Sequence, residues 1–134
     1  MWIFILYLKV MKVLVVEDDS FLVNAYRIKF GRLGYETKMA VDGESALKIL
    51  SEWTPDVVVL DLVMPKMDGY EFLEKMRSVP EYRNIPVLVS TNLGQPEDVD
   101  RAKELGANNY VIKGNLSLSD LVNKLEELIP KKSI

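Results

Sequence analysis

The pattern of apolar and polar positions predicts five strands. Residues 13–16 and 57–60 are entirely apolar and show no alternation, which is typical of strands buried on both faces, as in parallel sheets. We expect the second of these strands to occupy residues 56–61. The remaining strands are predicted at residues 36–40, 86–91 and 109–113.

Five helices are predicted between and after these strands, because the intervening segments carry apolar residues at helical spacing behind capping residues. The first begins at Asp19 or Ser20 and ends near Leu33, before Gly34. The others begin at residues 42–44, at 68, at 97, and at 117 or 119. The apolar face of the first helix is assigned to Phe21, Leu22, Ala25, Ile28 and Leu33.

A strand followed by a helix thus occurs five times, with short connections. Right-handed crossovers then require a parallel sheet with helices on both faces, so we predict a doubly wound (βα)5 fold of the α/β class. No linker or repeat interrupts the pattern. We expect one domain over residues 11–130, an apolar N-terminal extension at residues 1–10 and a short tail at residues 131–134.

The apolar extension at residues 1–10 is far shorter than the roughly 20 residues that a bilayer span needs. It also lacks the charged start and the cleavage site of a signal peptide. Two interpretations are open: an extension without function, or an extra strand or contact surface. We expect no membrane span and a cytoplasmic protein.

Composition narrows the function classes. The net charge of -3, without a basic run, argues against nucleic acid as a direct partner. The chain has no cysteine, which excludes disulfides and thiolate chemistry. It has no histidine either, so the commonest general base and metal ligand is absent.

Polar side chains follow four of the predicted strands. They are Glu17 and Asp18, Asp61, Thr91 and Lys113. Because ligands of open α/β sheets bind beyond the carboxyl ends of strands, we expect these side chains to share one crevice. Three carboxylates there repel one another and call for a small divalent cation such as Mg²⁺. The hydroxyl group of Thr91 and the ammonium group of Lys113 could hydrogen-bond to a phosphoryl group bound beside this cation.

Together with the turn residues Met64-Pro65 and Met67-Asp68-Gly69, and with Tyr110 ahead of Lys113, this set resembles the receiver domain of two-component response regulators. The resemblance covers about residues 12–130. Within the family, the chain resembles the stand-alone regulators of the chemotaxis type. It implies a flavodoxin-like fold with strand order 2-1-3-4-5.

The resemblance also implies the roles of the acidic residues. Asp61 would accept a phosphoryl group from a phosphohistidine on a histidine kinase or phosphotransfer protein. Asp18 and Asp61 would bind Mg²⁺ directly, together with the backbone carbonyl of Val63, and Glu17 would act largely through water. The chain would be a signalling domain that assists its own phosphoryl transfer and hydrolysis, rather than an enzyme in the ordinary sense.

Three further residues would respond to the phosphoryl group. Lys113 would pair with its oxygens, Thr91 would donate a hydrogen bond to it, and Tyr110 would turn inward. The surface formed by the helix at 97–105, the strand at 109–113 and the last helix would then change and bind a downstream protein. The sequence leaves the oligomeric state open. A homodimer would form through this same surface.

Several of these residues have a plainer interpretation. Asp19 is expected to cap a helix rather than to bind metal, and Asp68 likewise. Ser90 competes with Thr91, because strand neighbours point to opposite sides, and the resemblance favours Thr91. Tyr110 is either a switch or simply part of the core.

The chain departs from the family pattern at a few positions. Gly114 follows Lys113 where the family usually has proline, and Asn92 stands where a small residue is usual. Val63 and Leu93 are apolar at two positions that often tune hydrolysis, so we expect slow loss of the phosphoryl group.

Two other functions compete with a phosphorylated receiver. Asn92 and Gly114 leave open a receiver-like interaction module that works without phosphorylation. A Mg²⁺-dependent phosphohydrolase would need a second acid two residues after its nucleophile, and Val63 occupies that position.

Overall fold

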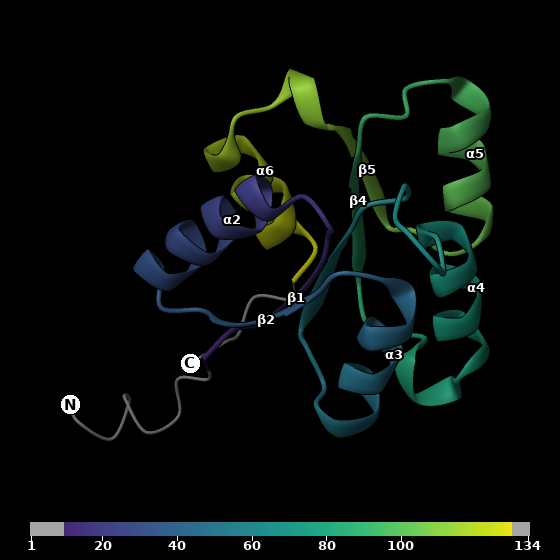
Figure 1. Ribbon diagram of the computed structural model, residues 1–134, viewed down its shortest axis with the longest axis horizontal. Coiled ribbons are helices and arrows are strands. Elements are labelled where there is room, and N and C mark those ends of the chain that lie inside the picture. Colours follow the sequence, from purple (N-terminus) through teal and green to yellow (C-terminus); the bar gives the residue numbers. More distant parts are fainter. Residues whose placement is uncertain (1–9, 130–134) are drawn as a thin grey trace.

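The computed structural model describes residues 10–129, and Figure 1 shows strands and helices alternating along them. Apart from Val10, the predicted extension and tail lie outside the described residues. The strands are β1 (Lys12–Val16), β2 (Glu36–Ala40), β3 (Val57–Leu60), β4 (Val87–Thr91) and β5 (Asn109–Ile112). The α-helices are α2 (Ser20–Arg32), α3 (Gly43–Glu52), α4 (Gly69–Ser78), α5 (Pro96–Glu104) and α6 (Leu118–Glu127). Two short 3-10 helices are η1 (Pro80–Tyr82) and η2 (Lys113–Asn115).

The sheet is parallel throughout and its strand order is β2-β1-β3-β4-β5. Helices α2 and α6 cover one face, and α3, α4 and α5 cover the other (Figure 1). This is the predicted doubly wound, flavodoxin-like (βα)5 fold, and the prediction is confirmed.

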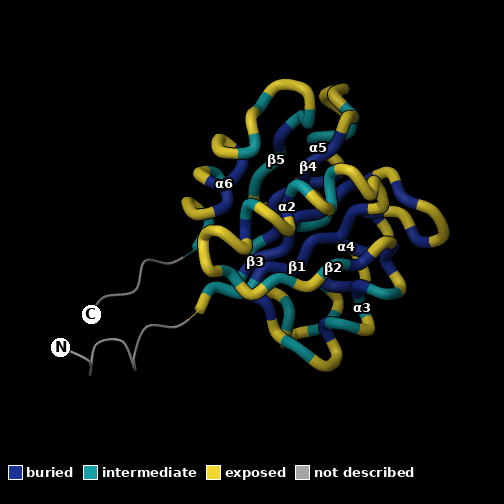
Figure 2. Tube along the Cα trace, turned by 60° about the vertical axis from the view of Figure 1, so that its left-hand side comes forward, coloured by how far each residue is buried: buried dark blue, intermediate teal, exposed yellow. Residues whose placement is uncertain are grey.

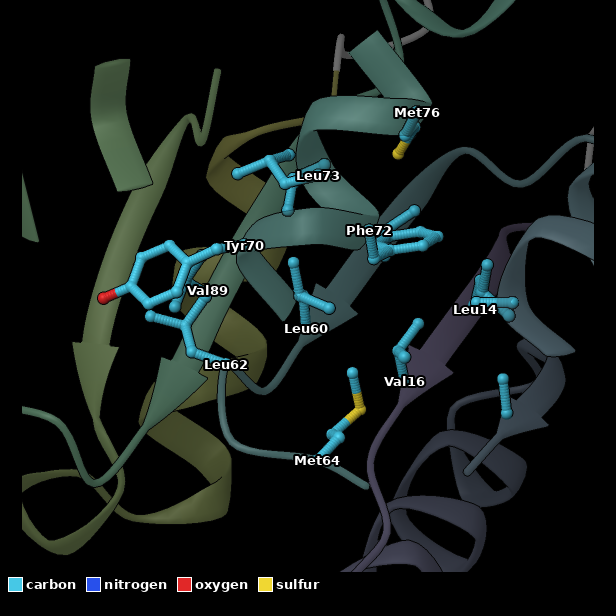
Figure 3. Packing of buried hydrophobic residues seen from close by; sticks show 14 of the residues in the cluster. Leu14, Val16, Leu60, Leu62, Met64, Tyr70, Phe72, Leu73, Met76 and Val89 are labelled. Carbon is cyan, nitrogen blue, oxygen red and sulfur yellow. The ribbon is translucent and has the colours of Figure 1, made fainter. Parts of the chain in front are cut away.

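The all-apolar runs are explained by a core on each face of the sheet. In β1, Leu14 and Val16 face the α3–α5 layer, whereas Val13 and Val15 face α2 and α6. Strand β3 divides its side chains in the same way, so every residue of it is buried. Figure 2 shows this buried centre within a largely exposed outer shell, and Figure 3 shows side chains of β1, β3 and β4 meeting those of α4.

The predicted apolar face of α2 is wrong in part. Phe21 is 86% exposed, and Ile28 and Leu33 are also exposed. Tyr26 and Phe30 are buried instead, with parallel rings whose centroids are 5.6 Å apart. Leu22, Tyr26 and Phe30 follow one another at a spacing of four residues and form one stripe, so of the predicted residues Leu22 does pack against the core.

The caps decide between the predicted helix starts. Asp19, not Ser20, caps α2, since its Oδ1 accepts hydrogen bonds from the amides of Phe21 at 2.9 Å and Leu22 at 3.3 Å. Ser117, not Ser119, caps α6 by accepting from the Asp120 amide at 3.1 Å. Asp68 caps α4 as predicted.

The start of α4 lies directly against the backbone that carries Asp61. A Cβ atom at Gly69 would be 2.4 Å from the Asp61 carbonyl oxygen and 2.6 Å from Leu62 Cα. The Gly69 amide donates to the Leu62 carbonyl at 3.0 Å. Glycine is therefore required here for close approach of two backbone segments.

We predict that Gly69→Ala lowers the free energy of unfolding by roughly 1–3 kcal/mol, because the added methyl group overpacks rigid backbone. Gly31→Ala is the matched control, since a Cβ there meets nothing within 4 Å. It should stabilise α2 by roughly 0.5–1 kcal/mol. Urea unfolding measures both, and effects of the same sign would contradict this account.

Candidate functional site

The carboxyl ends of β1, β3, β4 and β5 open into one pocket of about 480 Å³. The polar side chains predicted from the strand ends all line it. The lining residues are Glu17, Asp18, Asp19, Asp61, Val63, Thr91, Asn92 and Lys113. Tyr110 and Leu93 do not belong to this lining.

Backbone hydrogen bonds beyond the strand ends hold the acidic residues in register. The Asp61 amide donates to the Val16 carbonyl at 3.0 Å, and the Glu17 amide donates to the Ala40 carbonyl at 2.9 Å. Both bonds continue the pairing of the parallel strands past their assigned ends. The two carboxylates are thereby placed side by side by the sheet itself.

Three carboxylates converge in the pocket. One oxygen each of Glu17, Asp18 and Asp61 lies within 4.8 Å of the others. Glu17 is 2% exposed and Asp61 5% exposed, whereas Asp18 is open to solvent. Hard oxygen donors with one side open to water are the donor set that Mg²⁺ prefers, so the residues present fit that ion.

Lys113 is the cation among these acids. Its Nζ lies 2.7 Å from Glu17 Oε1 and 3.0 Å from Asp61 Oδ2. Burial lowers the pKa of Lys113, but the hydrogen bonds with Glu17 and Asp61 outweigh it and raise the pKa on balance. Burial raises the pKa of Glu17, against the effects of the Lys113 and Asp19 hydrogen bonds. The lysine is therefore charged, and it compensates part of the cost of burying carboxylates.

The second oxygen of Asp61 has a partner that the sequence did not indicate. The Val63 amide donates to Asp61 Oδ1 at 3.3 Å, while the Val63 side chain is 58% exposed at the rim. The same turn contains Lys66 with φ of 60°, in the left-handed region, and Lys66 Nζ lies 3.8 Å from Asp42. The turn therefore contributes a backbone amide to the Asp61 carboxylate and is itself joined to Asp42 through Lys66.

The structure separates Thr91 from Ser90. Thr91 is fully buried at the wall of the acidic pocket, and its Oγ1 accepts a hydrogen bond from the Leu93 amide at 3.4 Å. Ser90 lies on the other side of β4, where its Oγ accepts from Tyr26 at 3.4 Å. Of the two hydroxyls, Thr91 is the one in the pocket.

Tyr110 is hydrogen-bonded to the loop that follows β4. Its hydroxyl donates to the Leu93 carbonyl at 2.7 Å, and its half-buried ring packs on the α3–α5 side of the sheet. Burial, followed by electrostatic interactions with Tyr70, Asp98 and Asp61, raises the pKa of Tyr110 to about 12. Tyr110 therefore contacts the segment directly after Thr91.

A neighbouring group on α4 and α5 was not found from the sequence. The Tyr70 hydroxyl donates to Asp98 Oδ1 at 3.2 Å, and the Arg101 guanidinium lies 4.0 Å from the Tyr70 ring centre. Asp98 lies 28 residues after Tyr70 and Arg101 lies further along the chain, so no local pattern signals these contacts.

Two departures from the family pattern, Asn92 and Gly114, are exposed, and Asn92 lines the pocket. Gly114 is exposed in η2, and a Cβ atom there would meet nothing within 4 Å. Strand β5 ends at Ile112, so Lys113 begins this 3-10 turn rather than ending the strand as predicted.

Known proteins similar to this chain include response regulators and related phosphotransfer proteins. Residues 13–126 match the family model of the response regulator receiver domain. The chain is 33% identical over 122 residues to sporulation initiation phosphotransferase F of Bacillus subtilis, covering 91% of this chain and 96% of that protein. Chemotaxis response regulator CheY4 of Vibrio cholerae has a similar structure, with a TM-score of 0.84, 29% identity and coverage of 90% of this chain and 100% of that one.

Other relatives are longer. The probable transcriptional regulator ycf27 of Guillardia theta is 37% identical over 102 residues, which cover 76% of this chain and 39% of that protein. The chain therefore spans about two fifths of the length of such relatives. Within the residues that the structure describes, none of the helices is both long and apolar enough to cross a membrane.

We predict that Tyr110→Phe flattens the alkaline loss of stability. The pKa of Tyr110 is about 12 in the folded chain, and a free tyrosine titrates near pH 10. The unfolded chain therefore releases this proton first as the pH rises, and the free energy of unfolding falls between about pH 10 and 12. Denaturant unfolding across this window should show a shallower decline in the variant. An identical decline in both proteins would contradict the assignment.

Proposed function

Since the chain belongs to the response regulator receiver domain family, we propose that it is a phosphorelay protein in which Asp61 accepts a phosphoryl group from a phosphohistidine of a partner. One observation carries the proposal: Lys113 Nζ bridges Glu17 and Asp61, in a pocket where three carboxylates lie within 4.8 Å. The partner must supply the histidine, because this chain has none.

The proposed metal ligands are Asp18 and Asp61, with the backbone carbonyl of Val63, while Glu17 acts through water. Three carboxylates and one ammonium group leave a local charge of about -2, which a divalent cation neutralises. When bound, Mg²⁺ supplies positive charge for the phosphoryl oxygens.

In the proposed transfer, an Asp61 carboxylate oxygen attacks phosphorus and the bond from phosphorus to the partner's imidazole nitrogen breaks. The imidazole leaves with the bonding electron pair and takes up a proton, and an acyl phosphate remains on Asp61. Lys113 Nζ, already 3.0 Å from Asp61 Oδ2, is placed to pair with a phosphoryl oxygen. Thr91, on the same pocket wall, would donate its hydroxyl to another oxygen.

We propose that this event changes the surface formed by α5, β5 and α6. A reorientation of Thr91 would disturb the hydrogen bond that its Oγ1 accepts from the Leu93 amide. The Leu93 carbonyl holds the Tyr110 hydroxyl, so the change would pass to β5. A downstream protein, or a second copy of the chain, would then recognise the altered surface.

The proposed setting is a cytoplasmic signalling protein that acts through protein contacts rather than by binding nucleic acid itself. We further propose that the acyl phosphate is long-lived. The exposed Val63 side chain stands beside the pocket without a polar group to orient water, and Leu93 is also apolar.

Acetyl phosphate tests the phosphoacceptor. Intact-mass measurement with Mg²⁺ should show a gain of about 80 Da, the mass of one phosphoryl unit on the nucleophile. The gain should be absent without Mg²⁺ and in Asp61→Asn. No gain in a protein that still binds Mg²⁺ would instead support the interaction module that works without phosphorylation. Turnover of a chromogenic phosphate ester would support the phosphohydrolase.

Asp18 and Asp19 provide a matched pair for the metal proposal. Both line the pocket, but Asp19 caps α2, and asparagine caps a helix as well as aspartate does. We predict that Asp18→Asn weakens Mg²⁺ binding by about tenfold or more, and Asp19→Asn by about threefold at most. Calorimetric titration measures both. Equal losses would mean that only the general negative potential attracts the ion.

A further inference from the structure

A second pocket lies behind the phosphoacceptor site, on the face of the sheet covered by α2 and α6. Its walls are largely apolar and come from α2, β5, α6 and the segment before α6. Ala25, Val111, Leu116 and Leu121 are among its lining residues. Several of these residues also belong to the core on this face of the sheet.

The volume of this pocket restricts what it can hold. It measures about 130 Å³. An apolar cavity of about 150 Å³ in another protein holds one benzene molecule, whereas pockets for drug-sized ligands measure about 300–1,000 Å³. The space therefore suits one six-membered ring.

Two buried hydroxyl groups belong to the lining. Tyr26 is 1% exposed and Ser90 is 2% exposed, and the Tyr26 hydroxyl donates to Ser90 Oγ across 3.4 Å. This distance exceeds the usual 2.5–3.0 Å of a hydrogen bond between hydroxyl groups. Each hydroxyl can both donate and accept, so the weakly bonded pair has capacity left for a third polar atom.

We propose that this pocket binds a small phenol-like molecule: a single aromatic ring that carries one hydroxyl group. The ring fills the apolar space between α2, β5 and α6. The hydroxyl group bonds to Tyr26 and Ser90, and completes a polar pair that is poorly bonded on its own. Apolar walls with a few convergent polar groups are the general make-up of small-molecule sites.

Lys113 connects this pocket to the acidic one, because it lines both. Its Nζ contacts Glu17 and Asp61, and the residue is also part of the lining of the second pocket. A bound ring therefore restrains the residue that pairs with the phosphoryl group. The consequence, a changed rate of phosphorylation, rests on the proposed function, whereas the binding itself does not.

Phenol and toluene are the probes, since they have nearly the same shape and differ by one hydroxyl group. Amide and methyl NMR spectra of the full chain should shift saturably with phenol around Ala25, Val111 and Leu121. We expect phenol to bind several-fold more tightly than toluene. Ser90→Ala and Tyr26→Phe should remove this preference. Each should lower the affinity for phenol by about three- to tenfold and leave the affinity for toluene unchanged.

Ala25→Phe is designed to fill the pocket and abolish binding of both probes; Ala25→Leu serves if the first variant does not fold. Shifts that do not saturate, or that persist in the filled pocket, would overturn the proposal. Equal affinity for the two probes in wild type would overturn the role of the hydroxyl pair. Phosphorylation by acetyl phosphate, with and without phenol, tests the coupling separately: saturable binding without a change in rate would refute only the coupling to Lys113.

Discussion

The Lys113 ammonium group, held between the carboxylates of Glu17 and Asp61, is the interaction on which the rest of the site depends. Both carboxylates are nearly inaccessible to water, and burying charge without compensation costs several kcal/mol. One lysine cannot balance three acids, so the pocket retains a negative charge that suits a divalent cation. A bound divalent cation would neutralise this charge and remove the repulsion that an incoming anion would otherwise meet.

The sheet makes this arrangement possible. Parallel strands β1, β3, β4 and β5 end at one edge, and each contributes a polar residue at or just after its last paired position. Burial of both faces of β1 and β3 gives these ends little freedom. The close approach of Gly69, at the start of α4, to the backbone of Asp61 further restricts the position of Asp61. The rigid scaffold therefore positions the acids before any ligand is present.

How far the sequence predicted this structure depended on the range of each interaction. Uninterrupted apolar runs and capping residues are local signals, and they predicted the strands and most helix starts. The strand order was implied by the resemblance to the receiver family. The inward face of α2 was misjudged because Phe21 is more apolar than Tyr26, yet tyrosine is the buried one, with a hydroxyl partner on β4. The acids, Thr91 and Lys113 were predictable because strand ends converge in such sheets. The Tyr70–Asp98 and Tyr26–Ser90 pairs were not, since their members lie 28 and 64 residues apart.

If Asp61 itself carries the phosphoryl group, chemical mapping of the modified residue will show it. An acyl phosphate is reduced by borohydride to an alcohol, with loss of phosphate, so a phosphorylated aspartate becomes homoserine. After phosphorylation and reduction, peptide sequencing by mass spectrometry should find homoserine at position 61 and unchanged aspartate at positions 18 and 19. Homoserine at another position, or none in a protein that has gained the mass of a phosphoryl group, would contradict the account.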